Sequence, residues 1–225
     1  MESKVIEQEV KKLAATAGQM DNRQQLLLQS LLSYRYTPYL KEAGSMGEID
    51  HFDNFYRSWF MPSMEQILAC FFDNKLAKRV AKKLVDVEDK LTLFASRYGN
   101  SLNILAMQAV LCQLYAIKLI RTGQLIKDDW FVTFAIHTYI LQQTSEKSEQ
   151  GDEESRRLEA SYIENEIRML AEIVDFVKRK CPQKTRASGP LSEVVVKNGL
   201  ELATSDLEVK KLVEVPAMQG TDSEN

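Results

Sequence analysis

The sequence predicts an all-α fold, a multi-helix bundle or helical array, and two observations support that prediction. Glycine and proline are scarce, with 9 and 5 among 225 residues, so few positions interrupt a helix. Apolar residues recur mainly three and four positions apart, which is the period of one face of an α-helix. Hydrophobic residues make up 44% of the chain, which is ample for a core. We therefore expect about seven helices between the N-terminus and Cys181.

The first two helices are expected at roughly residues 3–17 and 21–35. Asp21 suits the start of the second helix, because its carboxylate can accept hydrogen bonds from the first free amides. Pro38 lacks an amide hydrogen and is followed by the sequence EAGS. We expect the chain to break there.

A capping box, Ser45-x-x-Glu48, predicts that the third helix begins near Ser45. Its aromatic side chains lie at i, i+3, i+4, i+7 and i+8, and form one apolar face: Phe52, Phe55, Tyr56, Trp59 and Phe60. Such a face packs in the core or docks a partner. Pro62 is expected to end this helix, and Ser63-x-x-Gln66 to cap the next one.

A long amphipathic helix is predicted from Asn74 to Tyr98, with Gly99 as its stop signal. Its first half carries a basic group without an intervening acid: Lys75, Lys78, Arg79, Lys82 and Lys83. These cations could bind a phosphate backbone or an acidic protein segment. They could equally form a solvated face, because Asp86, Glu88 and Asp89 follow at once.

Residues 101–123 are apolar on nearly every side and are long enough to raise the question of a membrane span. Polar side chains interrupt the segment on several sides: Asn103, Gln108, Gln113 and Lys118. A charge in mid-segment costs roughly 3 kcal/mol in lipid. We therefore expect a buried helix at the centre of the fold and no membrane span.

The second half of the chain is expected to hold a helix over 128–143, although its β-branched residues also allow a strand, and a polar linker after it. A long helix over 152–181 follows, with heptad spacing typical of a packed seam: Ile163, Ile167, Leu170, Val174, Val177 and Cys181. We predict a helical domain over 1–181 and a flexible, loosely ordered tail over 182–225. In the tail, Asn198-Gly199 is a hairpin signal, and a short binding motif is the alternative.

Few residues suggest catalysis or metal binding. Glu48-x-x-His51 has the spacing of a helical di-iron ligand pair, but such sites need two of these motifs. Three widely spaced cysteines, Cys70, Cys112 and Cys181, give no disulfide framework and no Cys-x-x-Cys pair. Glycine-rich phosphate loops and the Gly-x-Ser-x-Gly motif are absent from the sequence. We expect no catalytic residues, no metal, no cofactor and no enzymatic activity, although a carboxylate-only enzyme stays open.

The function predicted from the sequence is a non-enzymatic helical adaptor, chaperone-like or assembly subunit that works by protein–protein contact. Its partner would bury the aromatic face or the heptad seam, and a second copy of the chain is one such partner. The alternative is a helical nucleic-acid-binding subunit that uses the basic group at 75–83. The N-terminus shows no secretion signal, and the unpaired cysteines suit a reducing compartment, so we expect a cytoplasmic protein.

Overall fold

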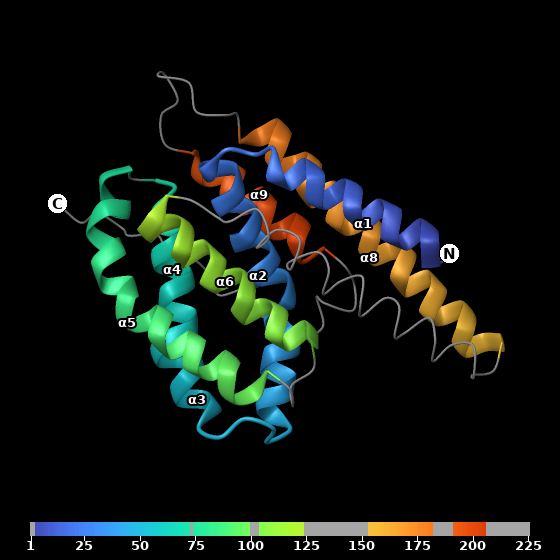
Figure 1. Cartoon of the computed structure of the whole chain (residues 1–225), viewed down its shortest axis with the longest axis horizontal. Coiled ribbons are helices and arrows are strands. Elements are labelled where there is room, and N and C mark those ends of the chain that lie inside the picture. Colours follow the sequence, from blue (N-terminus) through green and yellow to red (C-terminus); the bar gives the residue numbers. More distant parts are fainter. Residues whose placement is uncertain (1–2, 73, 100–103, 124–152, 182–190, 206–225) are drawn as a thin grey trace.

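The computed structural model describes residues 3–72, 74–99, 104–123, 153–181 and 191–205. These residues form helices and contain no strand, so the all-α prediction is confirmed for the described part of the chain. Figure 1 shows α2 and α6 crossing the middle of the molecule, α5 at one edge, and α1 beside α8 at the other. The helix predicted over 128–143 and the linker after it lie outside the described residues.

Helix α2, Asn22–Ser45, is the central element of the bundle. Asp21 caps it as predicted, since its side chain accepts hydrogen bonds from the amides of Arg23 and Gln24, while Gln24 accepts one from Asp21. The predicted break at Pro38 is wrong, because the helix continues through it. α2 is buried along most of its length against α6, and this packing outweighs the one hydrogen bond that proline removes.

The predicted capping box at Ser45 is also wrong. Ser45 is the last residue of α2, and its hydroxyl donates to the carbonyl of Glu42 at 2.7 Å. A turn follows in which Gly47 and His51 have φ angles of 77° and 55°. The next helix, α3 Phe52–Phe55, begins only after His51. The motif gave a wrong prediction because the Ser45 hydroxyl donates to a carbonyl of the preceding helix and does not cap the following one.

Pro62 does not end a helix either. The π-helix η1, Tyr56–Phe60, leads directly into α4, Met61–Ala69, whose first turn contains Pro62. In η1 the amide of Met61 donates to the carbonyl of Tyr56, the i→i−5 pattern that widens a turn. A proline in the first helical turn needs no partner for its missing amide hydrogen.

Two side chains hold the junction between η1 and α4. The buried amide of Gln113, from α6, donates to the carbonyl of Phe60 at 2.8 Å. Ser63, predicted as a cap, lies inside α4 and donates to the carbonyl of Trp59 at 2.8 Å. The polar Gln113 that interrupts the apolar sequence of α6 is therefore a core residue with a specific hydrogen-bond partner.

Helices α5, Asn74–Tyr98, and α6, Ile104–Thr122, lie against one another and cover α2 and α4. The central buried position predicted for α6 is seen in its fully buried side chains, among them Ala106, Val110, Cys112 and Ile117. In the described part of the chain, no helix combines the length and the apolar character that a bilayer crossing requires.

Helix α1, Ser3–Gly18, packs along α8, Glu153–Lys180 (Figure 1). On α1 the buried residues recur at alternating four- and three-residue steps: Ile6, Val10, Leu13 and Ala17. On α8 the side chains from Ile167 onward that follow the same spacing are buried as well. Each helix thus supplies an apolar stripe of the kind that two packed helices share.

The hairpin predicted at Asn198-Gly199 is wrong, because both residues lie inside α9, Glu193–Ala203. Ser192 caps this helix by accepting a hydrogen bond from the amide of Val195. α9 packs against α2 and α8. A Cβ added at Gly199 would lie 2.9 Å from the Phe176 ring and 3.2 Å from Leu31, so this glycine permits close helix packing rather than a turn.

Candidate interaction surfaces

The aromatic residues predicted as a partner-binding face form a cluster between α3, η1 and α5. Phe60 is fully buried, and Phe55 stacks on Phe94 with ring centroids 3.9 Å apart and planes 12° apart. Phe52 and Tyr56 are half-buried, with centroids 5.3 Å apart. A Cβ at position 44 would collide with the Phe52 ring. The glycine at this position therefore allows the cluster to pack closely against α2. Most of this face therefore packs inside the chain.

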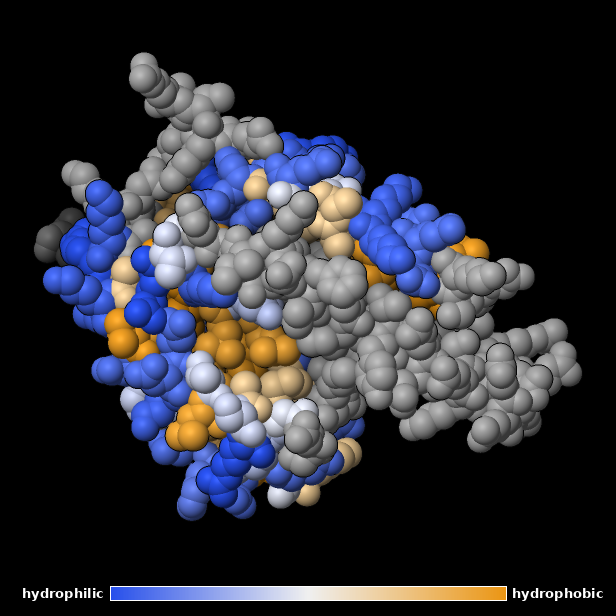
Figure 2. Space-filling view, viewed as in Figure 1, coloured by the Kyte–Doolittle hydropathy of each residue, from blue (hydrophilic) through white to orange (hydrophobic). Residues whose placement is uncertain are grey.

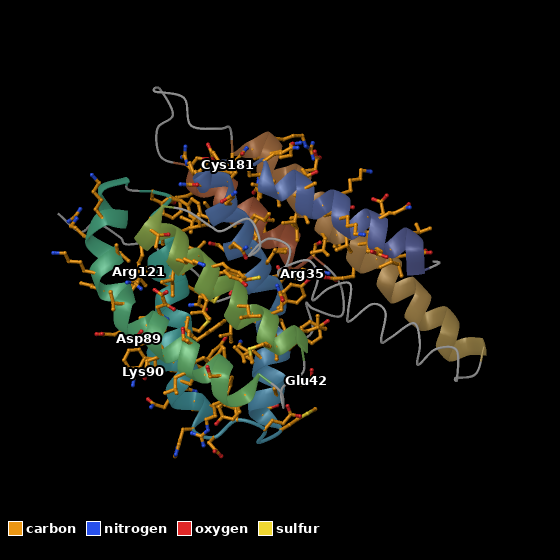
Figure 3. The ribbon with its side chains drawn as sticks, viewed as in Figure 1. Arg35, Glu42, Asp89, Lys90, Arg121 and Cys181 are labelled. Carbon is orange, nitrogen blue, oxygen red and sulfur yellow. The ribbon has the colours of Figure 1, made fainter. Side chains whose placement is uncertain are left out.

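Trp59 lies at the outer edge of the aromatic cluster and is half-buried. The ammonium of Lys90, on α5, lies 5.6 Å from the Trp59 ring centroid, and that of Lys41 lies 5.6 Å from Tyr56. Both distances are within the range of a cation–π interaction. Figure 3 shows Asp89 and Lys90 on the outer side of α5. Lysine side chains thus cover the solvent edge of the cluster.

The residues predicted as the heptad seam are buried within the described chain. Leu170 and Val177 are fully buried, and Ile167 and Val174 are no more than 6% exposed. The side chain of Ile163 lies outside the described residues. Since α1 packs along this helix, the seam from Ile167 onward meets another part of the same chain.

The predicted basic group is exposed. Lys78, Arg79, Lys82 and Lys83 all face solvent on α5, whereas the side chain of Lys75 lies outside the described residues. Of the acids that follow, Glu88 forms an ion pair with Arg121 on α6. Asp86 and Asp89 are exposed. Lys78, Lys82 and Lys83 are thus accessible from the solvent.

The main polar cluster of the core was missed from the sequence. Arg35 on α2 is 1% exposed and Glu166 on α8 is 5% exposed, and they form a two-pronged ion pair in which Nε of Arg35 donates to Oε1 of Glu166 at 3.0 Å. The Tyr36 hydroxyl donates to the same carboxylate at 2.6 Å, and Arg35 Nη1 donates to the carbonyl of Ala203 on α9 at 3.0 Å. Arg35 lies at the centre of the fold (Figure 3).

Burial and the neighbouring carboxylate of Glu166 raise the pKa of Tyr36 well above its ordinary value, so the phenol stays a donor. The cluster joins three helices that are far apart in the sequence. One signal could have indicated it: Arg35 follows Leu28 and Leu31 on the apolar stripe of α2, where a charge requires a buried partner. We read the cluster as a structural lock, because the two buried charges face each other and all three guanidinium nitrogens of Arg35 and the Tyr36 hydroxyl donate to acceptors.

The three cysteines pack in the core of the described structure. Cys70, Cys112 and Cys181 are free and buried. Burial raises the pKa of the Cys112 thiol to about 12 and that of Cys181 to about 11, which disfavours the nucleophilic thiolate. Within the described ranges, no three His, Cys, Asp or Glu side chains gather in a way that could hold a metal ion. His51 is exposed at the start of α3.

One further surface was not singled out from the sequence, the outward side of α6. Its half-buried residues lie at i, i+3, i+4 and i+7: Leu111, Leu114, Tyr115 and Lys118. We call these four residues the α6 face. Figure 2 shows apolar side chains gathered near the centre of the side on which α6 lies. Leu111 and Leu114 pack partly against the core, and part of their surface stays accessible.

Comparison with protein-family models, with curated proteins and with solved structures gives no match.

Proposed function

We propose that this chain is a non-enzymatic helical subunit, an adaptor, chaperone-like or assembly protein, that docks another protein on the α6 face. The observation that carries the proposal is the apolar outward side of α6, where Leu111, Leu114 and Tyr115 stand in place of the polar residues of an ordinary surface helix. An apolar stripe at i, i+3, i+4 and i+7 suits an amphipathic partner helix.

The placement of the other candidate faces supports this choice. The aromatic cluster and the described part of the seam are largely buried within the chain, so their side chains already have apolar neighbours. The cytoplasmic location and the coiled-coil character of the seam stay predictions. The loose order predicted for the tail does not hold for α9, which packs against α2 and α8.

Photo-crosslinking tests the proposal. With a photoreactive amino acid at Leu114, we expect a crosslink to a separate protein of the native cell, because this position would be covered in the complex. Val194 is the matched control, since it is an apolar residue that is 64% exposed on α9, far from the α6 face in sequence. Purified partner should then bind the Leu111→Lys variant at least about tenfold more weakly, as expected for loss of an apolar anchor.

Two outcomes would contradict the proposal. Crosslinks from position 114 only to residues of the same chain would show that the α6 face is covered internally. Identical products from positions 114 and 194 would show that the contact is non-specific.

A further inference from the structure

A small cavity lies where α2, α4 and α6 meet in the bundle (Figure 1). Its volume is about 10 Å³, which is about the least that one water molecule needs. All three helices contribute to its walls, among them Ser30 and Ser33 of α2, Ile67 of α4, and Gln113 and Ala116 of α6. Tyr34 also lines the cavity, and burial raises its pKa to about 12, so its phenol is neutral at pH 7. None of the described residues around the cavity carries a charge, and a neutral occupant therefore suits it better than an ion.

The orientation of the Gln113 side-chain amide follows from its neighbours at the junction of η1 and α4. Its Nε2 donates to the carbonyl of Phe60 at 2.8 Å and also to the hydroxyl of Ser63. Turning the amide over would place its oxygen against the Phe60 carbonyl, and neither of these two oxygens can donate. The nitrogen therefore faces the junction, and the oxygen has to find its donor elsewhere.

No such donor is present among the residues that the structure describes. Gln113 is 1% exposed, and its Oε1 forms no hydrogen bond with any of them. A buried acceptor costs free energy of folding unless a donor reaches it. Because Gln113 lines the cavity, a donor bound in the cavity can supply this hydrogen bond.

Two serines of α2 offer further acceptors to an occupant of the cavity. The hydroxyl of Ser30 donates to the carbonyl of Leu26 at 2.8 Å, and that of Ser33 donates to the carbonyl of Ala109 at 2.9 Å. Each hydroxyl has thus used its single hydrogen, and its oxygen can still accept. The walls on α2 and on α6 both present acceptors, and a water molecule has two hydrogens to donate.

We propose that this cavity binds one water molecule, which donates to Oε1 of Gln113 and to a serine hydroxyl of α2. The water links α2 to α6 and completes the hydrogen bonds of the residue that holds the junction between η1 and α4. The residues around the cavity are not those of the α6 face, so this site does not depend on the proposed protein contact.

The test is cross-relaxation between water and methyl protons, measured by nuclear magnetic resonance on the full chain with labelled isoleucine methyl groups. Ile67 lines the cavity, so its methyl protons should show a cross-peak at the water frequency, with the sign of a water molecule that tumbles with the protein. Ile117 is the matched control, because it is fully buried on α6 and is not among the residues around the cavity. We expect no water cross-peak at Ile117.

Two variants examine the role of the cavity walls. Gln113→Met removes the acceptor and should abolish the water cross-peak of Ile67, whereas a signal relayed through a serine hydroxyl would persist. Since this change also removes the donor to Phe60, Ala116→Val serves as the second variant. Its two added methyl groups fill the cavity and should abolish the same cross-peak. Cooperative unfolding in urea shows whether each variant is folded.

Three results would overturn the proposal. The first is the lack of a water cross-peak at Ile67 in the wild-type chain, which would show that the cavity is dry. The second is a pair of equal cross-peaks at Ile67 and Ile117, which would show general access of solvent to the core. The third is a cross-peak at Ile67 that a folded variant retains.

Discussion

Replacing Glu166 with alanine is expected to lower the free energy of unfolding by about 3–5 kcal/mol. The guanidinium of Arg35 would remain buried at 1% exposure, without the carboxylate that now accepts two of its hydrogen bonds. The Tyr36 hydroxyl would lose its acceptor as well. Chemical denaturation followed by circular dichroism measures this change.

A control on the same helix distinguishes the loss of the buried ion pair from the loss of any one carboxylate. Glu172 is spaced to pair with Arg168 at i, i+4, with its side chain 49% exposed, so Glu172→Ala should cost less than about 1 kcal/mol. Replacing both buried partners, as in Arg35→Met with Glu166→Leu, should cost less than Glu166→Ala alone, because no buried charge is left unpaired. Equal costs for Glu166→Ala and Glu172→Ala would show that the cluster does not lock the three helices together.

Leu170→Asp is expected to have a comparable effect, roughly 4–5 kcal/mol, through lost apolar contacts and a buried charge with no partner. Leu170 is fully buried on the side of α8 that carries the seam. The adjacent Ala171 is exposed, so Ala171→Asp is the matched control and should cost less than about 1 kcal/mol. Denaturation curves of the two variants that coincide would place Leu170 on a solvated face.

The helical periodicity was enough to predict the fold class and the central position of α6, because burial selects apolar residues at the same spacing throughout a helix. Asp21 marked the start of α2 because a cap depends on neighbours in the sequence. The failures at Pro38 and Asn198-Gly199 have the opposite cause. At Pro38 and at Asn198-Gly199, packing against a distant helix outweighed a local signal, as the buried length of α2 and the contact of Gly199 with Phe176 show.

The candidate sites could be predicted only in part, for a related reason. A stripe such as Ile167 to Val177 shows that something covers it, and α1 of the same chain packs along that helix. The sequence alone could not show which helix packs on this stripe. The pairing of Arg35 with Glu166 depends on two helices meeting across 131 positions. By contrast, the exposure of four basic residues could be predicted from their position on the polar side of an amphipathic helix: Lys78, Arg79, Lys82 and Lys83.

Helices α1 and α8 pack together and close the seam within one chain, and the α6 face is the surface that we propose for a partner. The most direct test is the concentration dependence of the urea denaturation midpoint, measured together with molar mass by light scattering. We predict the same midpoint over an about 100-fold range of protein concentration, because an internal seam unfolds without dissociation. A midpoint that rises with concentration, together with a dimer mass that Leu170→Asp abolishes, would contradict the account by placing the seam between two chains.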